Sequence, residues 1–158
     1  MMQIHFHSLS ILCRTSKEVL DLDYQVLFFH GKVGSGKSSI ARLINFCLGG
    51  NIERTTAIKQ EVNSVSLELT VGIYKVLLER DILNDAYVNA TCIDPNTNSF
   101  TVTVSVIGSN NPVWADKVYN ISDLIFYLLD INVLRTPANR KREDVGLVRL
   151  RGCLNLSH

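Results

Sequence analysis

Hydrophobic and polar residues alternate along this chain with two different periods, one typical of strands and one typical of helices. The points where the period changes divide the chain into predicted elements. The first thirty residues contain IHFHSLSILC (4–13) and the apolar run QVLFF (25–29), which predict strands. Residues 14–23, between them, predict a turn and a short strand. A continuous apolar run that ends near a glycine is typical of a buried central strand, so we expect one over residues 25–29.

After residue 36 the period becomes that of a helix. Apolar side chains recur at spacings of three and four, which places them on one helix face. They are Ile40, Leu43, Ile44, Cys47 and Leu48. Gly49 and Gly50 follow, and glycine commonly ends a helix because it accepts the left-handed conformation. We therefore expect a helix that begins near Lys37 and ends at these glycines.

Alternation with a period of two dominates residues 62–107. One face carries Val65, Leu67, Leu69 and Val71, and the other carries Ser64, Ser66, Glu68 and Thr70. The same alternation runs from Phe100 to Val106, after the turn signal DPNTNS (94–99), and Gly72 marks another turn. Short strands joined by tight turns predict an antiparallel meander with one polar face.

The link between the predicted strand and helix reads GKVGSGKS (31–38), the G-x-x-x-x-G-K-S pattern of a phosphate-binding loop (P-loop). Its glycines let the backbone approach phosphates, and amides from Gly34 to Ser39 would point at them from the positive end of the helix. Lys37 would contact the β- and γ-phosphates, the Ser38 hydroxyl would ligate Mg²⁺, and Ser39 would reach the α-phosphate. The predicted cofactors are ATP and Mg²⁺, and Lys37 is also the candidate catalytic residue. The predicted binding residues are Gly31, Lys32, Val33, Gly34, Ser35, Gly36, Lys37, Ser38 and Ser39.

Hydrolysis requires more than a phosphate-binding loop. It needs a carboxylate at the end of an apolar strand to organise Mg²⁺, and a residue that positions the attacking water. IFYLLD, which ends at Asp130, is better interpreted as part of a helix capped by Ser122 and continuing to about Asp130. NATCID, which ends at Asp94, runs directly into a turn. We therefore predict that this chain holds only part of a catalytic site.

Composition narrows the class of protein. The chain has 158 residues, 46% of them hydrophobic, which is enough for one globular domain. Its formal net charge of +1 argues against a strongly electrostatic nucleic-acid binder. No apolar run approaches the ~20 residues that span a bilayer, and the N-terminus does not resemble a signal peptide. The four widely spaced cysteines predict reduced thiols, three of them in apolar surroundings, and a cytoplasmic protein.

Three further groups are weaker candidates for sites. His5 and His7 share a strand face, but zinc needs more ligands than the sequence shows, so an ordinary strand surface is favoured. His30, beside the loop, is expected to pack or to form a hydrogen bond. The basic run at 140–142 is expected to be a solvated loop, with a contact to a nucleic-acid backbone as the alternative.

The order of these features resembles the N-terminal lobe of an SMC/SbcC-type ATPase, an ABC-class family (Rad/SbcC-like AAA domain) of chromosome maintenance and DNA repair. The resemblance covers roughly residues 4–150 and rests on GKVGSGKSSI (31–40), CLGG (47–50) and VSLELTVGIYKVLLERD (65–81). It implies an α/β P-loop NTPase lobe over residues 1–150, built from a strand–P-loop–helix unit and an antiparallel β-meander. Residues 151–158 would form an irregular tail.

The resemblance also implies partners. The metal-binding carboxylate, the catalytic glutamate and the signature motif would lie in a C-terminal lobe or partner subunit. Two copies would form an ATP-dependent dimer that acts on DNA in maintenance, repair or defence, with no membrane association. Arg14 would reach toward the nucleotide, and a solvated loop arginine is the alternative.

Two departures from the family pattern stand out. Val33 occupies a loop position where the family has asparagine, and no glutamine follows the meander, since the chain's glutamines are Gln3, Gln25 and Gln60. We therefore expect a truncated or partial chain.

Two other functions compete with this interpretation. A small stand-alone P-loop kinase or NTPase would follow its loop helix with parallel strands and crossover helices, against which the meander argues. The other is a non-catalytic remnant that binds nucleotide weakly or not at all.

Overall fold

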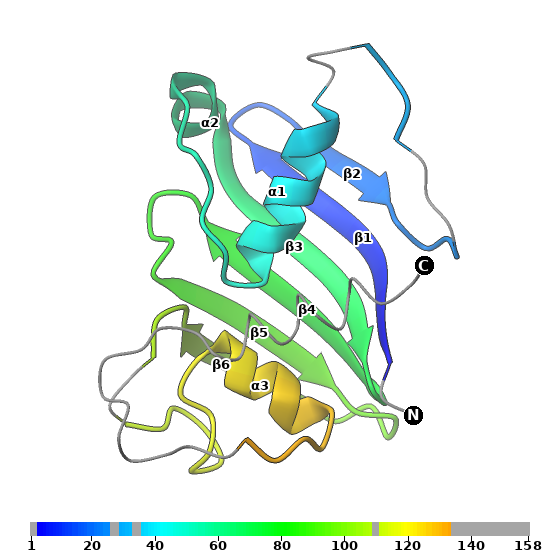
Figure 1. The fold of residues 1–158 in the computed structure, drawn as a ribbon, viewed down its shortest axis with the longest axis vertical. Helices are drawn as coiled ribbons and strands as arrows, with labels where there is room; N and C mark the ends of the chain where they lie inside the picture. The colour runs from blue at the N-terminus through cyan, green and yellow to red at the C-terminus, as the bar shows by residue number, and fades with distance from the viewer. Residues whose placement is uncertain (1–2, 26–28, 33–35, 109–110, 134–158) are drawn as a thin grey trace.

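A six-stranded antiparallel sheet forms the body of the molecule (Figure 1). The computed structural model describes residues 3–25, 29–32, 36–108 and 111–133. The strand order across the sheet is β2-β1-β3-β4-β5-β6, and each neighbouring pair is antiparallel. The strands are β1 (Ile4–Cys13), β2 (Lys17–Asp21), β3 (Val62–Val71), β4 (Tyr74–Asp81), β5 (Tyr87–Ile93) and β6 (Ser99–Ser105). The helices are α1 (Lys37–Cys47), α2 (Thr56–Glu61) and α3 (Ile121–Leu128).

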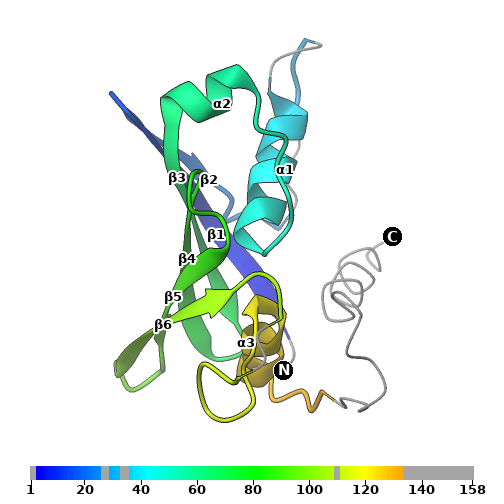
Figure 2. The ribbon, with the colours of Figure 1, turned by 90° about the vertical axis from the view of Figure 1, so that its left-hand side faces the viewer.

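The predicted meander is confirmed. Val65, Leu67, Leu69 and Val71 are all fully buried on one face of β3. Figure 2 shows α1 and α3 on the same side of the sheet, so one sheet face carries the core and the other is left polar. No described pair of strands is parallel, which counts against the stand-alone kinase architecture.

The predicted helix after the loop is also confirmed, and its end has a defined geometry. The helix α1 is followed by Gly49, whose φ of 94° is left-handed. The Gly49 amide donates to the Phe46 carbonyl and the Gly50 amide donates to the Asn45 carbonyl, at 3.0 and 2.8 Å. This pair of bonds is the Schellman motif, and it stops the helix where the double glycine predicted.

The predicted cap of α3 was wrong. Asn120, not Ser122, is the N-cap: its side chain accepts a hydrogen bond from the Asp123 amide at 2.9 Å. The Asp123 carboxylate in turn accepts a hydrogen bond from the Tyr119 amide at 3.0 Å. The side chains of Asn120 and Asp123 therefore each satisfy a backbone amide near the start of the helix. Ser122 is buried inside the first turn. The helical interpretation of IFYLLD holds, since Asp130 follows α3 and does not end a strand.

The strand predicted over residues 25–29 is not confirmed. Gln25 lies in an exposed bend, Phe29 lies outside any strand with 41% of its surface exposed, and residues 26–28 are outside the described part. A buried strand requires hydrogen-bonded neighbours, and none of the six strands pairs with Gln25 or Phe29. The short helix α2 was not predicted. Its clearest local signal is Thr55, whose hydroxyl accepts from the Ile58 amide.

An arginine joins α1 to the sheet. Arg80 follows Val76 and Leu78 on the core face of β4 and is only 3% exposed. Its Nη1 donates to the carbonyls of Phe46 (2.5 Å) and Gly50 (2.7 Å). Its Nε and Nη2 donate to the Asp85 carbonyl at 2.8 and 2.5 Å, and the guanidinium lies 4.0 Å from the centre of the Phe46 ring. Burial lowers the pKa of Arg80, while the Asp85 carboxylate, which also pairs with Arg54, acts in the opposite direction.

Replacing this arginine should loosen the whole helix–sheet contact. Arg80→Ala removes the guanidinium donors from the Gly50 and Asp85 carbonyls and one of the two donors of the Phe46 carbonyl, and we expect a loss of about 3 kcal/mol in the free energy of unfolding. Arg42→Ala is the matched control, because Arg42 is largely exposed on α1 and pairs with Glu53 at 3.7 Å, a contact that contributes under about 1 kcal/mol. Urea unfolding measures both. Equal losses in the two variants would show that Arg80 is not the anchor.

Candidate nucleotide-binding site

The described parts of the P-loop lie at the N-terminal end of α1. Gly31 and Lys32 precede the helix, and Gly36 to Ser39 form its start, while Val33, Gly34 and Ser35 lie outside the described residues. Figure 1 shows this end of α1 at the far end of the molecule from α3. The sequence therefore brings the predicted lysine and both predicted serines to one helix terminus.

Gly36 turns the chain into the helix. It is the N-cap residue, with φ 82° and ψ 4° in the left-handed region, and its carbonyl accepts from the amides of Ser39 (3.0 Å) and Ile40 (3.1 Å). No side chain caps this terminus and no acidic residue lies in the first turn. A Cβ added to Gly36 would meet no atom within 4 Å. The helix end is thus open beside Gly36 and has no side-chain anion of its own.

Lys37 folds back over the start of the loop. Its Nζ donates to the carbonyls of Gly31 at 2.6 Å and of Lys32 at 2.8 Å. These bonds curl the segment toward the helix and hold an ammonium group at the positive end of its dipole. Ser38 and Ser39 lie in the first turn, and both are exposed, whereas Lys37 is half-buried. The arrangement can accept an anion, because backbone amides, a lysine and two hydroxyls share one terminus.

Arg14 lies elsewhere along the sheet. It occupies the turn between β1 and β2, where its amide donates to the Glu61 carbonyl at the end of α2 (2.9 Å). That bond fixes its backbone and leaves the side chain exposed. A role for Arg14 at the nucleotide stays a prediction.

Two carboxylates that the sequence raised as metal ligands have other structural roles. Asp94 closes the β5–β6 turn: it accepts from the amides of Asn96 (2.8 Å) and Asn98 (2.9 Å), and from the Asn98 side chain (3.0 Å). The Asn98 side chain is the main cause of the lowered pKa of Asp94. Asp130 follows α3 with a left-handed φ of 57°. Asp94 thus directly follows β5 but its carboxylate closes a turn, and Asp130 follows a helix.

The described cysteines behave as core residues. Cys47 and Cys92 are buried, and burial raises the pKa of each thiol to about 12. Cys13 is half-buried, and all three are free thiols. Because a thiol reacts as the thiolate, Cys47 in α1 is a packing residue and not a nucleophile beside the loop.

The helix terminus with its amides and inward-folded lysine can accept an anion, and the family of the chain indicates which class of protein it is. The chain belongs to the AAA domain family, whose sequence model matches residues 4–135. This AAA-type family occurs in SMC/SbcC-like ATPases, and it implies nucleotide-binding ATPase function with ATP and typically Mg²⁺. Searches of curated proteins and of solved structures gave no match. Within the described residues no helix is both long and apolar enough to cross a membrane.

The left-handed turn at Gly36 can be tested directly. Gly36→Ala meets no steric obstacle, but an L-residue at φ 82° is strained, so we expect a loss of about 1 kcal/mol in unfolding free energy. Gly108→Ala is the control, because Gly108 is not left-handed and an added Cβ has no neighbour closer than 4.0 Å. Urea unfolding should place the control within about 0.5 kcal/mol of the parent. A stabilised Gly36→Ala variant would contradict the geometry of this turn.

Proposed function

We propose that this chain binds ATP–Mg²⁺ through residues 31–39 as the N-terminal half of an SMC/SbcC-like ATPase that acts in DNA maintenance, repair or defence. The observation that carries the proposal is the Lys37 ammonium, held by the Gly31 and Lys32 carbonyls over a helix terminus without a side-chain cap. The family match supports ATP as the ligand. Bound Mg²⁺ would neutralise phosphate charge, with Ser38 as its protein ligand.

The protein's own groups would divide the work of binding. Lys37 would exchange its carbonyl contacts, wholly or in part, for phosphate oxygens, and the amides at the start of α1 would donate to the same phosphates. The open space beside Gly36 suits a phosphate, since no side chain fills it. Ser39 would complete the set at the α-phosphate, and Arg14 would approach from the β1–β2 turn.

Catalysis would require a second lobe. Asp94 and Asp130 are placed away from the loop, so the carboxylate that organises Mg²⁺ would come from a C-terminal lobe or partner subunit in an ATP-dependent dimer. Large apolar side chains are exposed near the β2 edge and in the segment that follows it. They are Leu12, Val19, Tyr24 and Phe29, at 44, 62, 56 and 41% exposure. Such a cluster supports a docking role for this side of the lobe.

Nucleotide binding should depend on Lys37. We expect Lys37→Ala to weaken ATP–Mg²⁺ binding at least tenfold, because it removes the charge nearest the phosphates. Lys59→Ala, a lysine exposed on α2, should bind like the parent. Calorimetry gives the affinities, and urea unfolding confirms that both variants fold. Equal affinity of the parent and Lys37→Ala would remove the loop from the nucleotide site.

The chain alone should turn over ATP negligibly even when it binds well. Positioned phosphates without a water-orienting acid leave most of the barrier in place. Steady-state phosphate release measures this, with Lys37→Ala as the control for contaminating ATPases. Turnover of about 1 per second or faster, abolished by that substitution, would show a complete site within the chain.

A further inference from the structure

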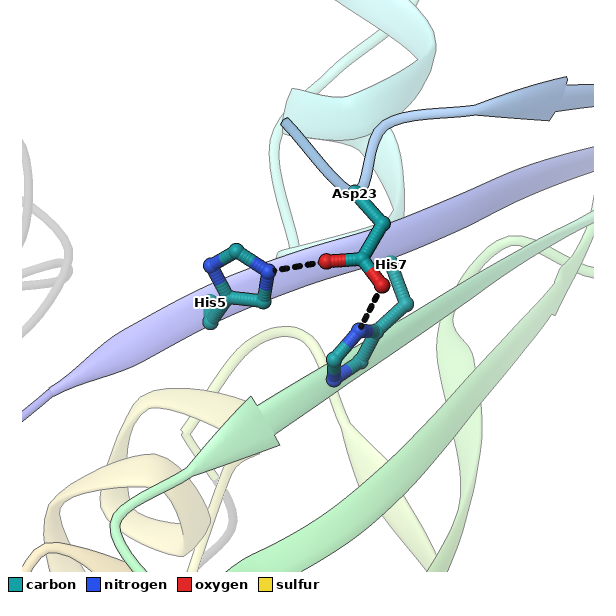
Figure 3. A group of neighbouring side chains, drawn as sticks. All are labelled: His5, His7 and Asp23. Atoms are coloured by element: carbon teal, nitrogen blue, oxygen red, sulfur yellow. Dashed lines mark hydrogen bonds and ion pairs between the residues drawn. The ribbon is translucent and has the colours of Figure 1, made fainter. Parts of the chain in front are cut away.

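Two histidines and an aspartate converge at the edge of the sheet, on the polar face opposite α1. His5 and His7 come from β1, and Asp23 follows the end of β2 (Figure 3). The ligand-type atoms of the three side chains all lie within 4.8 Å of one another. The pattern His-x-His was visible in the sequence. The third member was not, because Asp23 is brought there only by the pairing of β2 with β1.

The sheet itself builds the convergence. On β1, Phe6 pairs with core residue Leu69 and Leu9 pairs with core residue Leu67. Leu67 and Leu69 are two positions apart on β3, whereas Phe6 and Leu9 are three positions apart on β1. A β-bulge at His7 absorbs the extra residue, and bulges of this kind re-aim side chains. His5 and His7 are two residues apart on β1, and both side chains point to the polar face, with their rings 4.8 Å apart.

Backbone bonds hold the aspartate in place. The Leu22 amide donates to the His7 carbonyl at 2.8 Å, and Leu22 itself is buried. The Asp23 amide donates to the Asp21 side chain at 2.9 Å. The Asp23 carboxylate is then directed between the two rings, with His5 Nε2 at 2.5 Å from one oxygen and His7 Nδ1 at 3.5 Å from the other. The hydrogen bond from His5 is the main cause of the lowered pKa of Asp23.

We propose that His5, His7 and Asp23 form a binding site for a divalent transition-metal ion of the zinc type, with at least one coordination position open. Two imidazoles and one carboxylate are a recurrent ligand set for such ions. In a tetrahedral zinc site, ligand atoms are about 3.3 Å apart, given bonds of about 2.05 Å. The His7–Asp23 separation already fits, and the exposed Asp23 side chain can rotate to open the shorter His5–Asp23 contact to this value.

The ring nitrogen of His7 that does not face Asp23 has a hydrogen-bond partner, as metal-binding histidines usually do. Its Nε2 lies 2.7 Å from the Thr70 hydroxyl oxygen on β3. When Nε2 carries the proton and donates to Thr70, Nδ1 presents a lone pair toward the carboxylate. The Nδ1 lone pair and the carboxylate repel each other, and a cation bound between them would be coordinated by both. The Thr70 bond fixes the orientation of the His7 ring, as hydrogen bonds to metal-bound histidines do.

Co²⁺ titration of the full chain in ATP-free buffer tests this site. We expect one Co²⁺ per chain, with the visible absorption of a four- or five-coordinate ion, no thiolate charge-transfer band, and displacement by Zn²⁺ but not by excess Mg²⁺. Asp23→Asn and His5→Gln should each weaken binding at least tenfold. Glu18→Gln and His30→Gln are the matched controls outside the cluster and should bind like the parent.

Stability measurements provide the second readout. Zn²⁺ should raise the melting temperature of the parent and of Lys37→Ala, but not that of Asp23→Asn, because an ion that binds only the folded state stabilises it. Asp23 is exposed, so its replacement should leave the metal-free fold intact, which urea unfolding checks. Absent binding, a dominant thiolate band, or equal affinity in the parent and Asp23→Asn would overturn the proposal. The Lys37→Ala arm separates this result from the fate of the nucleotide site.

Discussion

The buried guanidinium of Arg80 is the interaction on which the placement of the P-loop helix depends. One cation from β4 satisfies carbonyls at the end of α1, just beyond it, and in the β4–β5 connection. The Phe46 and Gly50 carbonyls lie at the negative end of the helix dipole, where a positive charge is favourable. The carboxyl end of α1 is thereby fixed to the sheet. Its opposite end, with Gly36 and Lys37, is presented at a defined place without any side-chain cap.

The two ends of α1 therefore have complementary electrostatics. A fixed cation occupies the carboxyl end, and an unneutralised field of amides, together with Lys37, remains at the amino end. An anion at the amino end would complete the pattern without moving the helix. Buried cations tolerate little rearrangement, because a displaced guanidinium would itself be unpaired and would leave the Gly50 and Asp85 carbonyls without it. Such rigidity would suit the phosphate-binding role proposed for the opposite end of α1.

Periodicity predicted most of the fold because one-sided burial imposes it. The strands of the meander, α1 and its glycine stop all follow from which side chains face the core, and the structure has these elements where the pattern predicted them. The cap of α3 was predicted wrongly for a local reason. Ser122 and Asn120 are both good caps by residue type, and only the reciprocal bonds of Asn120 and Asp123 decide between them. Arg80 could have been found from the alternation Val76, Leu78, Arg80, which places a charge inward.

The two candidate sites also differ in how far the sequence alone could predict them. The P-loop pattern is local in sequence, so its lysine and serines could be predicted as binding residues from their spacing alone, whereas Asp23 joins His5 and His7 only through the β1–β2 register. The strand predicted over residues 25–29, between these two places, is not confirmed, and residues 26–28 lie outside the described part of the chain. Its described ends, Gln25 and Phe29, have no neighbours in the sheet, and Tyr24 and Phe29 are exposed. An apolar run alone does not place a strand, because a strand also needs hydrogen-bonded neighbours that composition does not show.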